Sequence, residues 1–117
     1  MKRWLFVLPL FSIMLLNCSS SLMKIDSSQL ENVQIRAHLY IPPEHGKYPA
    51  VIVLPTIAGM QPHVTSFASK LSKEGYITLA VDYHSGYSGK LGYYPHIEDA
   101  YDFLVDHPSV DQERIGI

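Results

Sequence analysis

The stretch Pro49-Ala50-Val51-Ile52-Val53-Leu54-Pro55 decides the fold of this chain. Its central residues form a continuous apolar run that is too short for a helix, and a proline bounds the run on each side. A run of this kind predicts a central strand of a sheet that is covered on both faces. The strand is expected to end near residue 54 and to open into a loop over residues 56–61.

A helix and a second strand are predicted after this loop. The apolar residues of the helix recur at i, i+3, i+4 and i+7, which places them on one face; they are Val64, Phe67, Ala68 and Leu71. Gly75 stands where a helix stop is expected. Residues 76–81 form another apolar run, and a crossover connection makes this strand parallel to the first.

The flanking segments continue the alternation of strands and helices. Residues 35–41 alternate between apolar and polar, which predicts a strand with one buried face and with His38 facing water. Helical spacing resumes at Ile97 and closes at Pro108, and residues 114–117 begin a third apolar strand. The pattern indicates the α/β class, with helices packed on a mostly parallel sheet.

Composition excludes several functional classes. The chain is 47% apolar and 17% charged, as in a globular protein, and its net charge is -2. Its nine Lys and Arg residues are scattered, which argues against a nucleic-acid surface. A single cysteine excludes an internal disulfide and a cysteine-based zinc site. The six histidines show no metal-binding spacing, so we expect neither a metal nor a cofactor.

The N-terminus predicts export. Lys2 and Arg3 precede an apolar run over residues 4–16, the layout of a secretory signal. The run is shorter than the roughly 20 residues of a membrane-spanning helix, although an uncleaved anchor or a buried helix stays possible. The sequence Leu15-Leu16-Asn17-Cys18, followed by three serines, resembles the bacterial lipoprotein signal, in which the cysteine is lipidated. Asn17 departs from the Gly, Ala or Ser that is usual before this cysteine.

This resemblance implies three regions in the chain. Residues 1–17 would be a signal peptide, residues 18–33 a lipidated Cys18 with a tether, and residues 34–117 the folded domain. The mature protein would be a lipoprotein anchored to a membrane of the bacterial cell envelope. The alternative is that Cys18 is an ordinary residue near the cleavage point and that the protein is periplasmic or secreted.

Chemistry is expected beyond the carboxyl ends of the strands, where open α/β sheets form their crevices. The loops at this edge are residues 56–61 and 83–94. Backbone N–H groups after the first strand can point into the cleft, and Gly59 permits a tight turn there. A catalyst of acyl transfer needs such N–H donors, because they bind the negative oxygen of the tetrahedral intermediate. A plain strand-to-helix turn explains the same composition. Ser88 is not expected to be a nucleophile, because its surroundings lack one residue of Gly-x-Ser-x-Gly.

Several segments together resemble the dienelactone hydrolase family of α/β-hydrolases, because their order and spacing agree. They are Pro49 to Met60, Phe67-Ala68 through Leu71, Glu74-Gly75-Tyr76-Ile77, Ala80-Val81-Asp82-Tyr83 and Val110 to Ile117. The resemblance implies a partial α/β-hydrolase fold that stops before the nucleophile elbow. It implies that the N–H of Ile57 is an oxyanion donor and that Thr56, where the family often has His or Glu, lies beside the substrate. The nucleophile, acid and histidine would all follow Ile117.

The resemblance implies a hydrolase of carboxylic esters or lactones that is inactive as this chain. A small-molecule ester or lactone would be its substrate only if the rest of the hydrolase domain were present. It also implies that the last strand is an unpaired apolar edge, with one face of the sheet lacking a covering helix. An alternative is a non-catalytic surface lipoprotein that contacts a partner through the tyrosine-rich loop 83–94. A nucleotide-binding domain is a third reading, but the chain lacks the glycine fingerprint.

Overall fold

Five strands and two helices make up the described part of the chain. The structure is a computed structural model, and it describes residues 19–26, 34–56, 58–82 and 94–117. The elements in chain order are β1 (Ser19–Asp26), β2 (Gln34–Ile41), β3 (Tyr48–Val53), α2 (Pro62–Lys73), β4 (Ile77–Asp82), α3 (Tyr94–Asp106) and β5 (Val110–Gly116). The predicted α/β class is confirmed.

The strands form one mixed sheet in the order β1-β2-β4-β3-β5. β3 is parallel to both β4 and β5, whereas β2 is antiparallel to β4 and β1 is antiparallel to β2. The expectation of a mostly parallel sheet therefore holds only for the half built around β3. That half needs helical crossovers, whereas antiparallel neighbours such as β1 and β2 require only a short connection.

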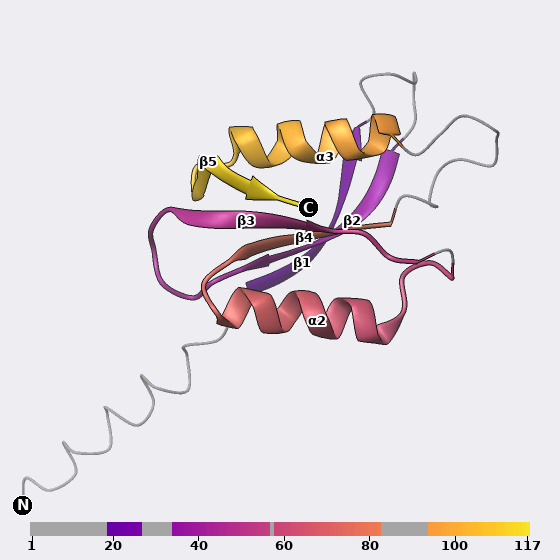
Figure 1. Cartoon of the computed structure of the whole chain (residues 1–117), viewed down its shortest axis with the longest axis horizontal. Coiled ribbons are helices and arrows are strands. Elements are labelled where there is room, and N and C mark those ends of the chain that lie inside the picture. The colour runs from indigo at the N-terminus through magenta and orange to yellow at the C-terminus, as the bar shows by residue number, and fades with distance from the viewer. Residues whose placement is uncertain (1–18, 27–33, 57, 83–93) are drawn as a thin grey trace, which may run out of the picture.

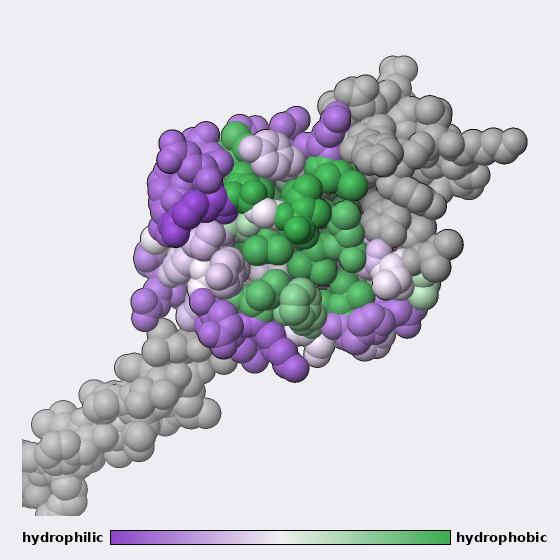
Figure 2. All heavy atoms as spheres, in the orientation of Figure 1, coloured by the Kyte–Doolittle hydropathy of each residue, from purple (hydrophilic) through white to green (hydrophobic). Residues whose placement is uncertain are grey.

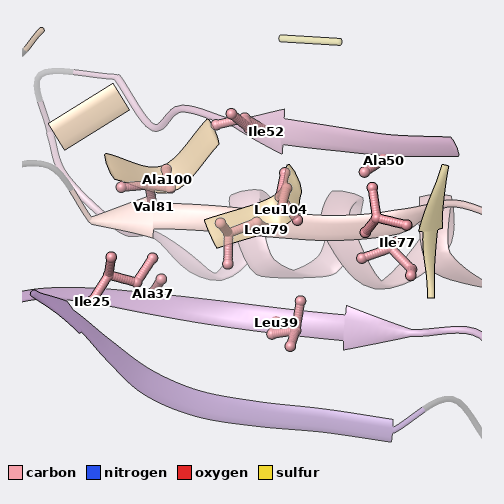
Figure 3. Close-up of a cluster of buried hydrophobic side chains, with 11 residues drawn as sticks. Ile25, Ala37, Leu39, Ala50, Ile52, Ile77, Leu79, Val81, Ala100 and Leu104 are labelled. Atoms are coloured by element: carbon pink, nitrogen blue, oxygen red, sulfur yellow. The ribbon is translucent and has the colours of Figure 1, made fainter. Parts of the chain in front are cut away.

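The two helices cover opposite faces of the sheet, with α3 on one side and α2 on the other (Figure 1). The hydrophobic core on the α3 side draws residues from all five strands, and these meet Ala100 and Leu104 of the helix (Figure 3). Its members are Ile25, Ala37, Leu39, Ala50, Ile52, Ile77, Leu79, Val81, Ala100, Leu104 and Val110. β4 lies at the centre, and its residues 77–81 are all buried.

The tether expected over residues 18–33 is wrong where the structure describes it. Ser19–Asp26 is strand β1, which pairs along its whole length with β2. Ile25 explains this, because it is only 7% exposed and belongs to the core. The strand was not predicted because the segment begins with three serines and has few large apolar residues. Cys18 and residues 1–17 lie outside the described residues.

The remaining differences concern the ends of elements and the exposure of one side chain. β3 begins at Tyr48 and so includes Pro49, which lies at an irregularity in the pairing with β5, where a missing backbone donor is tolerated. α3 begins at Tyr94 and β5 at Val110, both earlier than predicted. His38 was expected to face water but is half-buried, since polar positions of β2 lie on the face that α2 contacts.

Both ends of α2 follow from sequence. Pro62 occupies the first turn, where its missing N–H would have no partner within the helix. At the other end the N–H of Gly75 donates to the carbonyl of Ser72 at 3.1 Å, and the N–H of Tyr76 donates to that of Leu71 at 3.2 Å. This pair of bonds is the Schellman motif, and Gly75 has the positive φ of 98° that the motif requires. The predicted helix stop is confirmed.

In the part of the chain that the structure describes, neither α2 nor α3 is long and apolar enough to cross a bilayer.

Candidate functional site

The candidate site lies at the carboxyl edge of the parallel strands. β3 and β4 run in the same direction, with Val53 paired to Ala80 near their ends. The segment 54–61 leaves this edge from β3, and Asp82 ends β4 beside it. Because a crevice in an open α/β sheet forms beyond such strand ends, the predicted loop is in the expected place.

A tight turn directly follows β3. The N–H of Gly59 donates to the carbonyl oxygen of Thr56 at 2.8 Å, and Gly59 has a φ of 82°. This bond uses the N–H of Gly59 inside the turn, so Gly59 shapes the loop rather than supplying an oxyanion donor. Thr56 is exposed beside it, as a residue that meets a substrate must be. Ile57, the predicted donor, lies outside the described residues.

Gln61 fastens this turn to the start of α2. Its side-chain Nε2 donates to the carbonyl of Ala58 at 3.0 Å, and its own carbonyl accepts the N–H of Val64 at 2.9 Å. The helix starts at Pro62, three residues beyond Gly59, so its N-terminal end lies next to this turn. That end carries partial positive charge, and the first turn of α2 has no acidic residue to offset it. Negative charge that develops in the crevice would be favoured.

Gln61 was missed by the sequence reasoning. The available signal was a polar residue immediately before Pro62. This is the N-cap position, where a polar side chain usually accepts a backbone N–H of the first helical turn. Gln61 is at that position, yet its side chain makes no cap bond to the helix. It bonds the preceding turn instead, a use of the side chain that only coordinates reveal.

Asp82 at the end of β4 is tied to β2. Its Oδ2 lies 3.4 Å from Nη2 of Arg36, the residue directly opposite in the antiparallel register. The carboxylate side chain is 15% exposed and the guanidinium side chain 59%. A cross-strand pair with one exposed partner contributes little, about 0.2–1 kcal/mol. Asp82 therefore lies at the carboxyl end of β4 as part of a pair that joins two strands.

Other predicted residues are placed only in part. His63 is exposed in the first turn of α2, whereas His84, Ser88 and the tyrosine-rich segment 83–93 lie outside the described residues. In α3 the carboxylates of Glu98, Asp102 and Asp106 are exposed, whereas Asp99 is buried. Over residues 19–26, 34–56, 58–82 and 94–117 no group of His, Cys, Asp and Glu is arranged to hold a metal ion.

Solved structures share the fold of this chain. A dienelactone hydrolase-like promiscuous phosphotriesterase from metagenomic libraries superposes with a TM-score of 0.69 at 20% identity, covering 86% of this chain and 49% of its own. A hypothetical protein from Pseudomonas aeruginosa gives a TM-score of 0.71 at 21% identity, covering 86% of this chain and 34% of its own. The architecture is that of α/β-hydrolases.

The family follows from the sequence. The model of the dienelactone hydrolase family matches residues 35–115, and the chain belongs to this family. It is 41% identical over 49 residues to a "Probable 2-oxo-3-(5-oxofuran-2-ylidene)propanoate lactonase" of Bradyrhizobium sp, covering 42% of this chain and 20% of that protein. It is 30% identical over 97 residues to the acyl-coenzyme A amino acid N-acyltransferase 1 of Mus musculus, covering 80% and 23%. The chain thus spans about a fifth of the length of these curated relatives.

Proposed function

We propose that this chain supplies the substrate-side wall of a carboxylic ester or lactone hydrolase. The observation that carries the proposal is the turn after β3, in which Gly59 bonds back to Thr56 at 2.8 Å. This bond fixes the positions of Thr56 and Gly59 relative to each other beyond the end of a buried strand. Preorganised backbone N–H groups at such a place stabilise the negative oxygen of a tetrahedral intermediate. The N–H of Ile57 is the donor that we assign to this role.

The named relatives support acyl chemistry as the reaction class. One is named as a lactonase and another as an N-acyltransferase, and both names describe the transfer of an acyl group to or from oxygen or nitrogen. Both reactions pass through a tetrahedral intermediate with a negatively charged oxygen, and an oxyanion site binds this oxygen. Thr56, exposed beside the turn, would contact the part of the substrate next to the reacting carbonyl.

We further propose that the chain does not turn over esters by itself. An oxyanion site without a nucleophile and its base retains only a residual rate, as removal of the triad in related chemistry demonstrates. The test is to mix the purified full chain with p-nitrophenyl acetate and follow p-nitrophenolate in the first seconds. We expect no burst and no acyl adduct by mass spectrometry. A stoichiometric acyl-enzyme would refute the proposal, and the modified residue would identify a nucleophile within the chain.

We also propose that the protein is exported and anchored through lipidated Cys18. Two acyl chains anchor firmly where one does not, because each buried methylene adds roughly 0.8 kcal/mol. The full chain expressed in a bacterium should partition into the detergent phase of Triton X-114, and Cys18→Ala should move it to the aqueous phase. Ser19→Ala, a change of similar size at the next residue, is the matched control. Unchanged partitioning of Cys18→Ala would contradict the anchor.

A further inference from the structure

Strand β1 begins directly after the cysteine to which we assign the lipid anchor. All eight of its residues pair with β2, and the first of them, Ser19, lies opposite Ile41. A peptide bond joins Cys18 to Ser19 and keeps their Cα atoms about 3.8 Å apart. An extended tether over residues 18–33 would instead have spanned roughly 50 Å. Because β1 takes the place of that tether, a lipid on Cys18 would hold the folded sheet itself at the bilayer.

The strand register separates this anchor point from the candidate crevice. One row across the sheet contains four paired residues, which are Ser20 of β1, Tyr40 of β2, Thr78 of β4 and Val51 of β3. β1 and β3 cross this row in the same direction, since β1 and β4 are both antiparallel to β2 and β3 is parallel to β4. Cys18 precedes the row by two residues, and Thr56 follows it by five. The anchor point and the crevice therefore belong to opposite edges of the sheet.

The edge of the sheet at Ser19, which we call the anchor edge, also includes the loop 42–47 and the C-terminal end of α2. These two segments lie next to each other, because both line one hollow of about 280 Å³. In Figure 1 they are at the left of the sheet, whereas the turn after β3 is at the right. In the same view, hydrophilic residues gather toward the left end of the described part (Figure 2). The anchor edge is thus a polar surface.

The side chains of the anchor edge suit the headgroup layer of a bilayer. The loop 42–47 and the end of α2 carry exposed charges of both signs, which are Lys47, Lys70, Lys73, Glu44 and Glu74. Tyr76 at the start of β4 is 37% exposed, and tyrosine favours the interface because its ring is apolar and its hydroxyl polar. Asp111 at the start of β5 is paired with Arg114 at 2.7 Å. By contrast, residues 56–63 at the crevice include no Lys or Arg.

We propose that the anchor edge rests on the headgroups of the bilayer and that the candidate crevice opens on the opposite side, toward the aqueous compartment. This inference rests on the lipid anchor and the ester hydrolase proposed above. At ~3.3 Å per residue the turn after β3 would stand roughly 20 Å further from the bilayer than Cys18. The ester bonds of membrane lipids lie at the level of the anchor, out of reach of the crevice. The substrate class is therefore a small ester or lactone dissolved in water.

A second orientation would lay the sheet on its side, with the whole of β1 along the bilayer. The exposed side chains of β1 are three serines, Leu22 and Lys24, so this side offers one large apolar side chain and one charge to the membrane. The anchor edge offers more charged contacts and the interfacial tyrosine. The two orientations differ at Lys24, which lies near the bilayer only if the sheet is on its side.

Quenching of a fluorescent label by nitroxide lipids measures the orientation. Cys18 is the only cysteine of the chain, and lipidation blocks its thiol, so a cysteine introduced elsewhere is labelled alone. His63→Cys and Lys73→Cys are a matched pair, because both residues are exposed on α2 and lie about 15 Å apart along the helix. The lipidated full chain is inserted into preformed phosphatidylcholine vesicles that carry a nitroxide on the headgroup. We expect the label at Lys73 to be quenched about threefold more than the label at His63.

A second pair of labels tests the sheet lying on its side. His45→Cys places the label in the loop 42–47 of the anchor edge, and Lys24→Cys places it near the far end of β1; both residues are exposed. We expect strong quenching at His45 and weak quenching at Lys24. Equal quenching at these two positions would overturn the proposal in favour of the sheet on its side.

The remaining outcomes separate this proposal from those on which it rests. Quenching at His63 that equals or exceeds that at Lys73 would overturn the orientation, while flotation of the protein with the vesicles would leave the lipid anchor standing. Failure of the wild-type chain to float would overturn the anchor and the orientation together. The ester hydrolase is tested apart from both, because the burst assay with p-nitrophenyl acetate needs no membrane.

Discussion

The core on the α3 side of the sheet and an open apolar groove on the α2 side are built from neighbouring residues, yet only the core is closed. The groove is lined by residues 51–54, Phe67, Leu71, Tyr76 and Ile117. In β3, Ile52 is 1% exposed, whereas Val51 and Val53, which point to the other face, are half-buried and line the open groove. In α2, Ala68 is fully buried beside Phe67 at 54% exposure. Apolar character is the same in both regions. The difference is whether another element covers the face, which teaches that the sequence of one element does not decide its burial.

The largest expected effect comes from a substitution in the closed core. Leu79 at the centre of β4 is 0% exposed and packed within the core (Figure 3), so Leu79→Ala should lower the free energy of unfolding by about 2–5 kcal/mol. Phe67→Ala removes a larger side chain, but one that is already more than half exposed. We expect it to cost under ~1 kcal/mol. Urea denaturation of the full chain, followed by circular dichroism, measures both.

The ratio of these two effects is what the comparison predicts. Equal losses would mean that Phe67 is covered in solution, either by a second copy or by another part of the chain. Repeating the measurement at a hundredfold lower protein concentration separates these cases, since only burial in a dimer depends on concentration.

An intermediate effect concerns the turn that ends α2 beneath the open groove. Gly75 has a φ of 98°, and a Cβ added there would meet nothing within 4 Å. Gly75→Ala should therefore cost only the backbone strain of a left-handed residue, about 1–2 kcal/mol. Gly116→Ala is the matched control, because a Cβ there also meets open space and the backbone needs no positive φ. Equal stability of the two variants in urea would show that the Schellman turn relaxes without cost.

The strands around β3 could be predicted because their signals are local. Continuous apolar runs marked β3 and β4, and Gly75 marked the helix stop, and each depends on a few adjacent residues. β1 could not be predicted in the same way. Its serines give no apolar alternation, and the strand exists because β2 offers it a partner along its length. Strand pairing of this kind is a tertiary effect that overrides the local sequence.

The candidate site divides in the same manner. The position of the loop after β3 and the need for Gly59 followed from a buried strand that ends before a helix. The bond from Gln61 to Ala58 did not, because the same residue could equally have capped α2. The N–H of Ile57 stays a prediction. From the sequence, one face of the sheet was expected to lack a covering helix, and the open groove lies on such a face. That Phe67 lines this groove was not predicted, because the position of Phe67 in the apolar stripe of α2 suggested that it is buried.

The smallest effect lies in the loop that leads into β5. Burial lowers the pKa of His107 below the ordinary histidine value of 6.5, and its Nδ1 accepts the N–H of Ser109 at 3.2 Å. The folded state thus favours the neutral ring, and below pH 6.5 the unfolded chain binds more protons. Stability from this residue is complete above pH 6.5 and is lost as the pH falls through the lower folded pKa. His107→Gln should remove that part of the pH dependence, by less than the glycine effect. Urea midpoints measured between pH 7.5 and 4.5 check it, and parallel profiles for the two proteins would show that the protonation of His107 has no influence on how β5 is held.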